Sequence, residues 1–489
     1  MTNDEKDGRR PDRRAAGAMA AARAEFPAWR STPPEDRAAR LGELRRRLVG
    51  IRDEVVGRIS ADTGKTRAEA LTSDLLPTLE LLRYLEKNAA RILRPRRAHT
   101  PFIFRASTSR IEYRPRGVVL VIAPWNNPLQ LSLVPAASAL AAGNAVILKP
   151  SERAPATGEV MGRLFEHAGW EEGAFQVVDG GPEVARALVA AGPDLIFFTG
   201  GTENGRAVYE AAAARLIPVI LELGGKDPMI LFADADLDRA ARGAVYGAFA
   251  HAGQHCVSVK RLYVEASVYE QFLQQVADET RSLAATSDWG RVIDDQVRAK
   301  AREQVREAVA AGARLLTPGD ENQAGATPTL VADVEQSMPI VQDETFAPVL
   351  AARAFETEAE AADLANDSRF GLNASVWTQD EARADRVVWR LQTGNVYVNN
   401  VLVNVGNPWL PFGGTKASGI GRYHGADGLR AFCLEASVMV SRNRAGTEPN
   451  WFPRGEQAGA IAELIELRYG DSGSWWGRLG RWLSLLRRM

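Results

Sequence analysis

The sequence has few cysteines and almost no net charge. Its 489 residues include two cysteines, and 60 basic side chains stand against 61 acidic ones. Two cysteines are too few for a disulfide framework, and they are compatible with a reducing compartment. A balanced charge gives no overall field that would attract a polyanion, so we expect no nucleic-acid partner.

Long apolar runs are also missing. No stretch reaches the ~20 apolar residues that a membrane-spanning helix requires, and the charged residues 1–14 lack the apolar core of a secretory signal. We therefore expect a cytoplasmic protein. With 45% hydrophobic and 25% charged residues the composition is that of a globular chain, which excludes disorder and collagen-like repeats. The length predicts about two or three domains.

The N-terminal region predicts helices followed by a β hairpin. Residues 1–30 are rich in charge and are predicted as a mobile arm that leads into a first helix. Leucine and isoleucine at spacings of three and four predict one helix over residues 41–59 and another over 71–82, in which Pro77 could introduce a kink. Short β-like runs around Ser and Thr in residues 100–117 indicate the hairpin.

A regular alternation of apolar runs and Ala-rich helical segments follows. The apolar runs are residues 118–123, 145–148, 175–178, 195–198 and 219–221. Continuous apolar runs between helices predict a parallel sheet covered on both faces, and such sheets bind ligands at the carboxyl ends of their strands. A less regular alternation continues from residue 229 to about residue 400. We therefore predict an α/β fold of two α/β lobes with a small β appendage.

Cys256 is a candidate nucleophile in the run Gly-Gln-His-Cys, directly after an apolar helical segment. A cysteine considered alone is more often a small buried hydrophobic residue. A nucleophilic one must ionise, and because an ordinary thiol has a pKa of ~8.5 it needs activating surroundings. His255 is the obvious partner for a Cys–His pair, but adjacent side chains diverge, so we disfavour that pair.

Glu222 and Asn126 are candidates for acid–base and oxyanion chemistry. Glu222 ends an apolar run, and burial there would raise its pKa towards that of a general base; the alternative is a capping acid. Asn126 lies in Pro-Trp-Asn-Asn-Pro (124–128), straight after an apolar run. Its amide could donate to a developing oxyanion, or it could form an Asx turn.

The run Phe-Thr-Gly-Gly (198–201), with Gly205 after it, is a strand–glycine–helix junction that suits a phosphate at a helix N-terminus. The spacing of Gly200 and Gly205 matches a P-loop, but Gly205-Arg206 is not Gly-Lys-Ser/Thr, so we reject that interpretation. A strict Gly-x-Gly-x-x-Gly strand–helix fingerprint is absent.

Together these motifs resemble the aldehyde dehydrogenase superfamily over residues 35 to about 440. The matching runs, in chain order, are Pro-Trp-Asn-Asn-Pro (124–128), Lys-Pro-Ser-Glu (149–152), Phe-Thr-Gly-Gly (198–201), Glu-Leu-Gly-Gly-Lys (222–226), Gly-Gln-His-Cys (253–256), Glu-Thr-Phe-Ala-Pro (344–348), residues 366–372, and Pro-Phe-Gly-Gly-Thr-Lys (411–416) with Ser-Gly (418–419). Two positions depart from the usual motifs: Gly201 replaces a common Ser, and Ala347 replaces a usual Gly.

The resemblance implies a domain organisation. Residues 1–99 and 118–222 would form a Rossmann-like NAD-binding domain, and residues 223–411 an α/β catalytic domain. Residues 100–117 and 430–442 would form a small β oligomerisation element, which implies a homodimer or homotetramer. Residues 443–489 extend past the family core.

The resemblance also implies roles for the candidate residues. Cys256 would attack the aldehyde to form a thiohemiacetal, while the side-chain amide of Asn126 and the backbone amide of Cys256 hold the oxyanion. Hydride would pass to nicotinamide, and Glu222 would activate water to hydrolyse the thioester. A soft nucleophile that can also leave, an oxyanion donor and a nearby base are what this chemistry requires.

The implied cofactor is NAD, with NADP as the alternative, and no metal is implied. Lys149 and Glu152 would contact the adenosine ribose, and Glu152 favours NAD because it would repel a 2′-phosphate. Glu344 would bind the nicotinamide ribose, Phe346 would pack near the nicotinamide, and Trp125 would flank the substrate and cofactor passages. The other implied cofactor contacts are Ser151, Gly200, Gly201, Gly205, Leu223 and Gly224.

Two features bear on the aldehyde. Tyr423-His424-Gly425 stands where many members have Glu-x-Gly, as in the fatty-aldehyde and aromatic-aldehyde branch, although a packed turn would also explain it. The expected entrance loop, residues 401–410, is apolar and has no Arg or Lys. We therefore expect a long-chain or bulky apolar aldehyde.

The C-terminal run, residues 475–489, places Trp and Leu on one helical face and Arg around the other. This pattern predicts an interfacial helix that docks on an anionic membrane surface, which would make the protein peripheral there. A helix packed on the protein itself or on a neighbouring subunit would show the same pattern, because Arg stems cover apolar surface.

The residues also leave other functions open. In a CoA-acylating dehydrogenase a thiol would resolve the thioester, and Glu222 argues against it because it supplies the base that water needs. A non-catalytic NAD-binding protein would not need Cys256, Glu222 and Asn126 together, and a cysteine hydrolase would not need the nucleotide-binding motifs.

Overall fold

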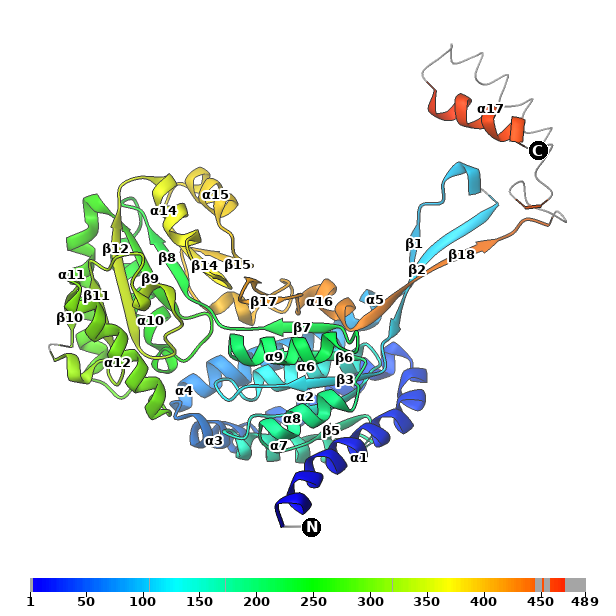
Figure 1. Cartoon of the computed structure of the whole chain (residues 1–489), viewed down its shortest axis with the longest axis horizontal. Helices are drawn as coiled ribbons and strands as arrows, with labels where there is room; N and C mark the ends of the chain where they lie inside the picture. The colour runs from blue at the N-terminus through cyan, green and yellow to red at the C-terminus, as the bar shows by residue number, and fades with distance from the viewer. Residues whose placement is uncertain are drawn as a thin grey trace. The chain divides into compact units, whose positions relative to one another are not determined.

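The computed structural model describes residues 3–104, 106–171, 173–318, 320–444, 451–452 and 458–470 (Figure 1). The predicted membrane-contacting run, residues 475–489, lies outside the described residues. The chain divides into two compact units, residues 1–95 with 112–436, and residues 96–111 with 437–489. All candidate site residues belong to the first unit.

The N-terminal region is helical throughout. Its elements are α1 (Asn3–Ser31), α2 (Pro34–Gly50), α3 (Arg52–Thr63), α4 (Arg67–Ala70), the π-helical turn η1 (Leu71–Leu75) and α5 (Leu76–Ile92). The prediction of a mobile arm over residues 1–30 is wrong, because α1 has a buried stripe at helical spacing, formed by Ala15, Ala18, Met19 and Ala22. Pro77 lies in the first turn of α5, where its missing N–H is tolerated, rather than at a kink inside a helix.

A six-stranded sheet has the order β17-β7-β6-β3-β4-β5. Its strands are β3 (Val118–Ile122), β4 (Ala145–Lys149), β5 (Phe175–Val177), β6 (Leu195–Thr199), β7 (Val219–Glu222) and β17 (Gly419–Ile420). The five strands predicted from the apolar runs are present and parallel, and β17 is antiparallel to β7. The connecting helices are α6 (Gln130–Ala141), α7 (Pro155–His167), α8 (Pro182–Ala190) and α9 (Thr202–Ala213).

Both faces of this sheet are covered, as the continuous apolar runs predict. Val119 and Val121 of β3 belong to one core cluster, which also contains residues of α5 and α6. Val118, Leu120 and Ile122 belong to another, which contains residues of α1 and α8. The prediction of an α/β fold with a parallel sheet is confirmed.

A seven-stranded sheet has the order β10-β11-β12-β9-β8-β14-β15. Its strands are β8 (Asp227–Leu231), β9 (Val259–Glu265), β10 (Arg314–Thr317), β11 (Thr329–Ala332), β12 (Val349–Phe355), β14 (Asn373–Trp377) and β15 (Asn395–Val398). All neighbours are parallel except β10 and β11. Its helices are α10 (Leu237–Phe249), α11 (Tyr269–Ala284), α12 (Asp295–Ala310), α13 (Pro339–Gln342), α14 (Glu358–Asn366) and α15 (Glu381–Arg390).

Short elements complete the first unit. They are the 3₁₀ turns η3 (Ala250–Gly253), η4 (Ala266–Val268), η5 (Glu321–Gln323) and η6 (Val403–Gly406), the strand pair β13 (Phe370–Gly371) and β16 (Thr415–Lys416), and α16 (Gly425–Ala431). Residues 254–258 connect the turn η3 to β9 of the seven-stranded sheet. Cys256 lies in this connection.

A separate three-stranded sheet has the order β1-β2-β18 and consists of β1 (Arg96–Ala98), β2 (Ser107–Pro115) and β18 (Cys433–Ser441). The predicted hairpin exists, since β1 and β2 are antiparallel, but Phe102–Phe104 forms the 3₁₀ turn η2 instead of a strand. The helix α17 (Ala458–Tyr469) belongs to the second unit. Within the described part of the chain, no helix has the length and apolar character to cross a bilayer.

Trp29 of α1 gives a test of this helix's contribution to stability. It is 2% exposed, its Nε1 donates to the carbonyl oxygen of Leu140, and its ring packs on Trp170. We expect Trp29→Ala to lower the free energy of unfolding by ~3–5 kcal/mol. The matched control, Trp389→Ala, removes a ring that is 91% exposed and should change stability by less than ~0.5 kcal/mol. Guanidinium unfolding measures both; equal effects would contradict the packing of α1.

Candidate active site

Glu222 is the last residue of β7, at the carboxyl end of the parallel strands. It is paired with Thr199 of β6 on one side and Gly419 of β17 on the other. The side chain is buried, and its Oε1 has no hydrogen-bond partner among the described residues. Burial raises the pKa of Glu222 well above its ordinary value, and Arg422 opposes this only in part. A carboxylate whose pKa is raised is a stronger base than an ordinary carboxylate.

Asn126 lies in the loop that follows β3, at the same edge of the sheet. Its side chain is 4% exposed, and its Nδ2 donates to the backbone oxygen of Gln254 over 3.0 Å. An amide NH₂ group has two hydrogens, so one remains for a substrate oxygen. This contact brings the loop of the six-stranded sheet to the segment that carries Cys256.

Cys256 follows η3, where the backbone turns sharply. His251 and Ala252 have positive φ values of 50° and 52°, and Gly253 has a φ of +69°. Such backbone is strained for residues with a Cβ, so the surroundings must hold it. Lys260 does so in part: its Nζ donates to the carbonyl oxygens of Gly253 and Ala347, each over 2.8 Å.

The thiol of Cys256 is partly buried. Burial, together with the negative charges of Asp227, Glu222 and Glu344, raises its pKa well above the ordinary thiol value. A raised pKa favours the protonated thiol over the thiolate. The disfavoured Cys–His pair is not present: Nδ1 of His255 faces the Nδ2 of Asn127 at 3.1 Å, and no hydrogen bond joins His255 to Cys256 in the described part of the structure.

A cavity of about 810 Å³ adjoins the carboxyl ends of β3, β4 and β6. Six of the predicted cofactor contacts line it: Trp125, Lys149, Ser151, Glu152, Gly200 and Gly201. Nζ of Lys149 and the carboxylate of Glu152 form an ion pair over 2.8 Å. Gly201 is the N-cap of α9, and a Cβ there would meet no atom within 4 Å, so the backbone N–H groups of this helix start are open to an anion. These features fit a dinucleotide.

The other predicted cofactor contacts lie outside this cavity. Gly205 packs against Leu223, since a Cβ on Gly205 would lie 2.3 Å from a Leu223 methyl group. Gly224 lies against Glu344 in the same way, with a Cβ 2.5 Å from the carboxylate. Phe346 meets the ring of Trp125 with centroids 5.9 Å apart, so it lies beside a residue that lines the cavity.

Tyr423 and His424 are both buried. The ring of Tyr423 packs on Phe197 and Phe412, at centroid distances of 5.3 and 5.7 Å. His424 has a positive φ of 66°, and neither of its ring nitrogens has a hydrogen-bond partner in the described structure. The packing agrees with the packed-turn interpretation of this run.

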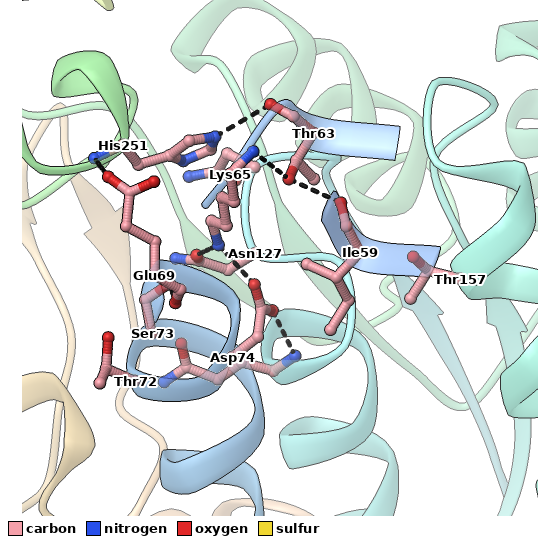
Figure 2. A network of polar contacts seen from close by, with 12 residues as sticks. Ile59, Thr63, Lys65, Glu69, Thr72, Ser73, Asp74, Asn127, Thr157 and His251 are labelled. Carbon is pink, nitrogen blue, oxygen red and sulfur yellow. Dashed lines mark hydrogen bonds and ion pairs between the residues drawn. The ribbon is translucent and has the colours of Figure 1, made fainter. Parts of the chain in front are cut away.

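Sequence reasoning missed a polar network around Lys65, which Figure 2 shows. Lys65, between α3 and α4, makes hydrogen bonds to Asp74 of η1 and to Asn127. The available signal was Asp74, a charged residue beside Leu75 in the predicted helix. Arg186 and Arg215, which line the cofactor cavity, were also missed, because they lie on or after helices with no motif around them.

Comparison with known proteins agrees with this geometry. The model of the aldehyde dehydrogenase family matches residues 9–438. The chain belongs to the aldehyde dehydrogenase family. The resemblance drawn from the motifs is thereby confirmed, and the family's members are oxidoreductases that act on aldehydes.

Individual relatives are similar over most of this aldehyde dehydrogenase. A 4,4′-diapolycopene aldehyde oxidase of Methylomonas sp is 46% identical over 430 residues, which cover 87% of this chain and 81% of the relative. A vanillin dehydrogenase of Corynebacterium glutamicum is 35% identical over 429 residues, 85% of this chain and 87% of the relative. The crystal structure of betaine aldehyde dehydrogenase from Staphylococcus aureus in complex with NAD+ has a TM-score of 0.82 at 32% identity, and covers 90% of this chain and 89% of that one.

The raised pKa of Cys256 predicts slow alkylation of the cofactor-free enzyme. Because the thiolate fraction of a group below its pKa rises with pH, the iodoacetamide rate at Cys256 should increase about tenfold per pH unit from pH 7 to 9. Mass spectrometry of the labelled peptide measures this rate. The control variant Cys433→Ala should show the same dependence of the Cys256 rate on pH. A rate that rises only about threefold between pH 8 and 9 would mean that the thiol has an ordinary pKa of ~8.5.

Proposed function

We propose that this aldehyde dehydrogenase oxidises a long-chain or bulky apolar aldehyde to the carboxylic acid, with NAD as the oxidant. The observation that carries the proposal is the contact between Asn126 and Gln254, because it joins an oxyanion donor to the segment of Cys256. Glu222, with its raised pKa, supplies the third function, a base at the same edge of the sheet.

The residues divide the reaction as follows. The sulfur of Cys256, once ionised, adds to the aldehyde carbon, and the oxygen accepts hydrogen bonds from Nδ2 of Asn126 and from the backbone N–H of Cys256. A bound NAD would supply the acceptor for the hydride of the thiohemiacetal. Glu222 then takes a proton from water, the water oxygen adds to the thioester carbon, and the thiolate of Cys256 departs.

Cofactor binding is proposed for the residues around the 810 Å³ cavity and for their neighbours at its catalytic side. Lys149 and Glu152 would contact the adenosine ribose, and Ser151 would be a further cofactor contact beside them. The N-terminus of α9 would bind the pyrophosphate at Gly200 and Gly201. Gly205, Leu223 and Gly224 shape the path between the two parts of the cofactor. Glu344 would bind the nicotinamide ribose, Phe346 would pack near the nicotinamide, and Trp125 would flank the substrate and cofactor passages.

The aldehyde class is supported by the entrance loop, residues 401–410. Val403, Trp409 and Leu410 are large apolar side chains that remain between 47% and 60% exposed, and the ring of Trp409 packs on Tyr84. The relative that is 46% identical is named for a diapolycopene aldehyde, and another is named for vanillin. We infer that this loop receives an apolar part of the substrate.

We also propose a domain organisation and an oligomerisation element for this chain. Residues 1–99 and 118–222 serve as the NAD-binding domain, and residues 223–411 as the catalytic domain. The strands β1, β2 and β18 are proposed as the oligomerisation element of a homodimer or homotetramer, since unpaired edges invite pairing with another chain. Contact of residues 475–489 with a membrane surface stays a prediction.

Substitution of the two proposed catalytic groups separates the two halves of the reaction. We expect Cys256→Ser to abolish NADH formation from any aldehyde. Glu222→Gln should still form one equivalent of NADH rapidly, because the hydride step precedes water attack, while steady turnover falls ~10²-fold. Rapid-mixing absorbance at 340 nm measures both phases. Steady turnover equal to wild type in Glu222→Gln would contradict its role as the base.

Glu152 gives a test of cofactor choice. A carboxylate beside the ribose would repel a 2′-phosphate, so Glu152→Gln should shift the ratio of kcat/KM values for NAD and NADP towards NADP by about tenfold. Glu203, an exposed acid in the first turn of α9, is the control, and Glu203→Gln should leave the ratio unchanged. An unchanged ratio in Glu152→Gln would mean that other residues determine the choice between NAD and NADP.

A further inference from the structure

The buried ammonium of Lys65 organises the polar network of Figure 2. Its side chain and that of Asp74 are both 0% exposed and form an ion pair. Nζ of Lys65 also donates to Oδ1 of Asn127. Asp74 accepts a further hydrogen bond from the backbone N–H of Gln130, at the start of α6. One ion pair therefore holds both ends of the short segment from Asn127 to Gln130.

The ammonium also determines which way the Asn127 amide faces. An ammonium group has three donors and no acceptor, so only the amide oxygen can meet it. The amide nitrogen of Asn127 consequently faces His255, where Nδ2 lies 3.1 Å from Nδ1. Since that nitrogen donates, Nδ1 of His255 accepts, and the proton of the neutral imidazole is on Nε2.

The surroundings keep His255 neutral. Burial, followed by the positive charges of Lys65 and Lys260, lowers the pKa of His255 to about 3. A protonated ring would present an N–H to the amide N–H₂ of Asn127, which cannot accept it. Charge and hydrogen bonding therefore select the same form of the ring.

Two consecutive residues of one loop thus meet two consecutive residues of the catalytic segment. Asn126 donates to the backbone of Gln254 over 3.0 Å, and Asn127 donates to the side chain of His255 over 3.1 Å. The ring of His255 also lines a cavity of about 330 Å³, so protein packing does not enclose it on every side. Among the described residues, the hydrogen bond from Asn127 is the polar contact that fixes the orientation of the His255 ring.

We propose that Asn127 and His255 are positioning residues. Their hydrogen bond keeps the loop of Asn126 at the distance from the segment of Cys256 that the oxyanion hole needs. Lys65 orients the amide of Asn127. The proposal rests on the proposed roles of Asn126 and Cys256. Small displacements of catalytic groups reduce turnover strongly, so we expect the loss in kcat rather than in KM.

The kinetic test uses variants that differ in a hydrogen-bond acceptor. His255→Phe removes the acceptor and should lower kcat about tenfold, with the KM for NAD and for a long-chain aldehyde within about twofold of wild type. His255→Gln offers an amide oxygen to Asn127 and should keep at least about half of the wild-type kcat. Asn127→Leu should resemble His255→Phe, and the double variant should lose no more than either single one. His167→Phe, an exposed histidine, is the control.

The second test does not depend on turnover. The chain has five histidines, so ¹⁵N spectra of histidine-labelled enzyme can be assigned by the signal lost in His255→Gln. We expect a neutral ring with the proton on Nε2 in the wild type at pH 7, and a different proton distribution in Asn127→Leu. A proton on Nδ1, a charged ring, a wild-type kcat in His255→Phe, or equal losses in His255→Phe and His255→Gln would each overturn the proposal.

The two tests also separate this proposal from the proposed function. If the wild-type enzyme oxidises no aldehyde, the proposed function fails. The spectra still show whether Lys65 and Asn127 fix the proton of His255 on Nε2. If His255→Phe or Asn127→Leu does not fold, as judged by its thermal unfolding, the wild-type spectrum assigned with His255→Gln supports or overturns the orientation that the proposal requires.

Discussion

The hydrogen bond from Asn126 to the carbonyl oxygen of Gln254 joins two parts of the chain that belong to different sheets. Asn126 follows β3 of the six-stranded sheet, and Gln254 precedes β9 of the seven-stranded one. Glu222 ends β7 at the same edge as Asn126, because parallel strands place their carboxyl ends together. The site therefore depends on contact between two independently paired sheets, and each sheet supplies a part that the other lacks.

Burial of charge is the other condition on which the site depends. Lys226, Asp227 and Lys260 are buried near Cys256, and burial shifts the pKa of each away from its ordinary value. For Lys260 the pKa is lowered to about 7, and its Nζ donates to the carbonyl oxygens of Gly253 and Ala347. Such groups reduce stability unless they are hydrogen-bonded, and the ammonium groups of Lys226 and Lys260 both donate hydrogen bonds.

Much of the fold and of the site could be predicted from the sequence. The strands of the six-stranded sheet are continuous apolar runs, and the motifs around Asn126, Glu222 and Cys256 are local in the chain. The helix α1 was missed because its exposed charges outnumber the small residues of its buried stripe, such as Ala15 and Ala22. The contact between Lys65 and Asn127 could not be predicted, because it joins side chains 62 positions apart whose meeting depends on tertiary packing.

The raised pKa of Cys256 has a consequence for the chemical durability of the resting enzyme. Peroxides oxidise the thiolate, and a thiol that stays protonated reacts slowly on the way to sulfenic and sulfinic acids. The protein thus carries Cys256 as a partly buried thiol whose raised pKa slows its oxidation by peroxides. An aldehyde dehydrogenase with such a thiol would keep that thiol in its reduced form for longer.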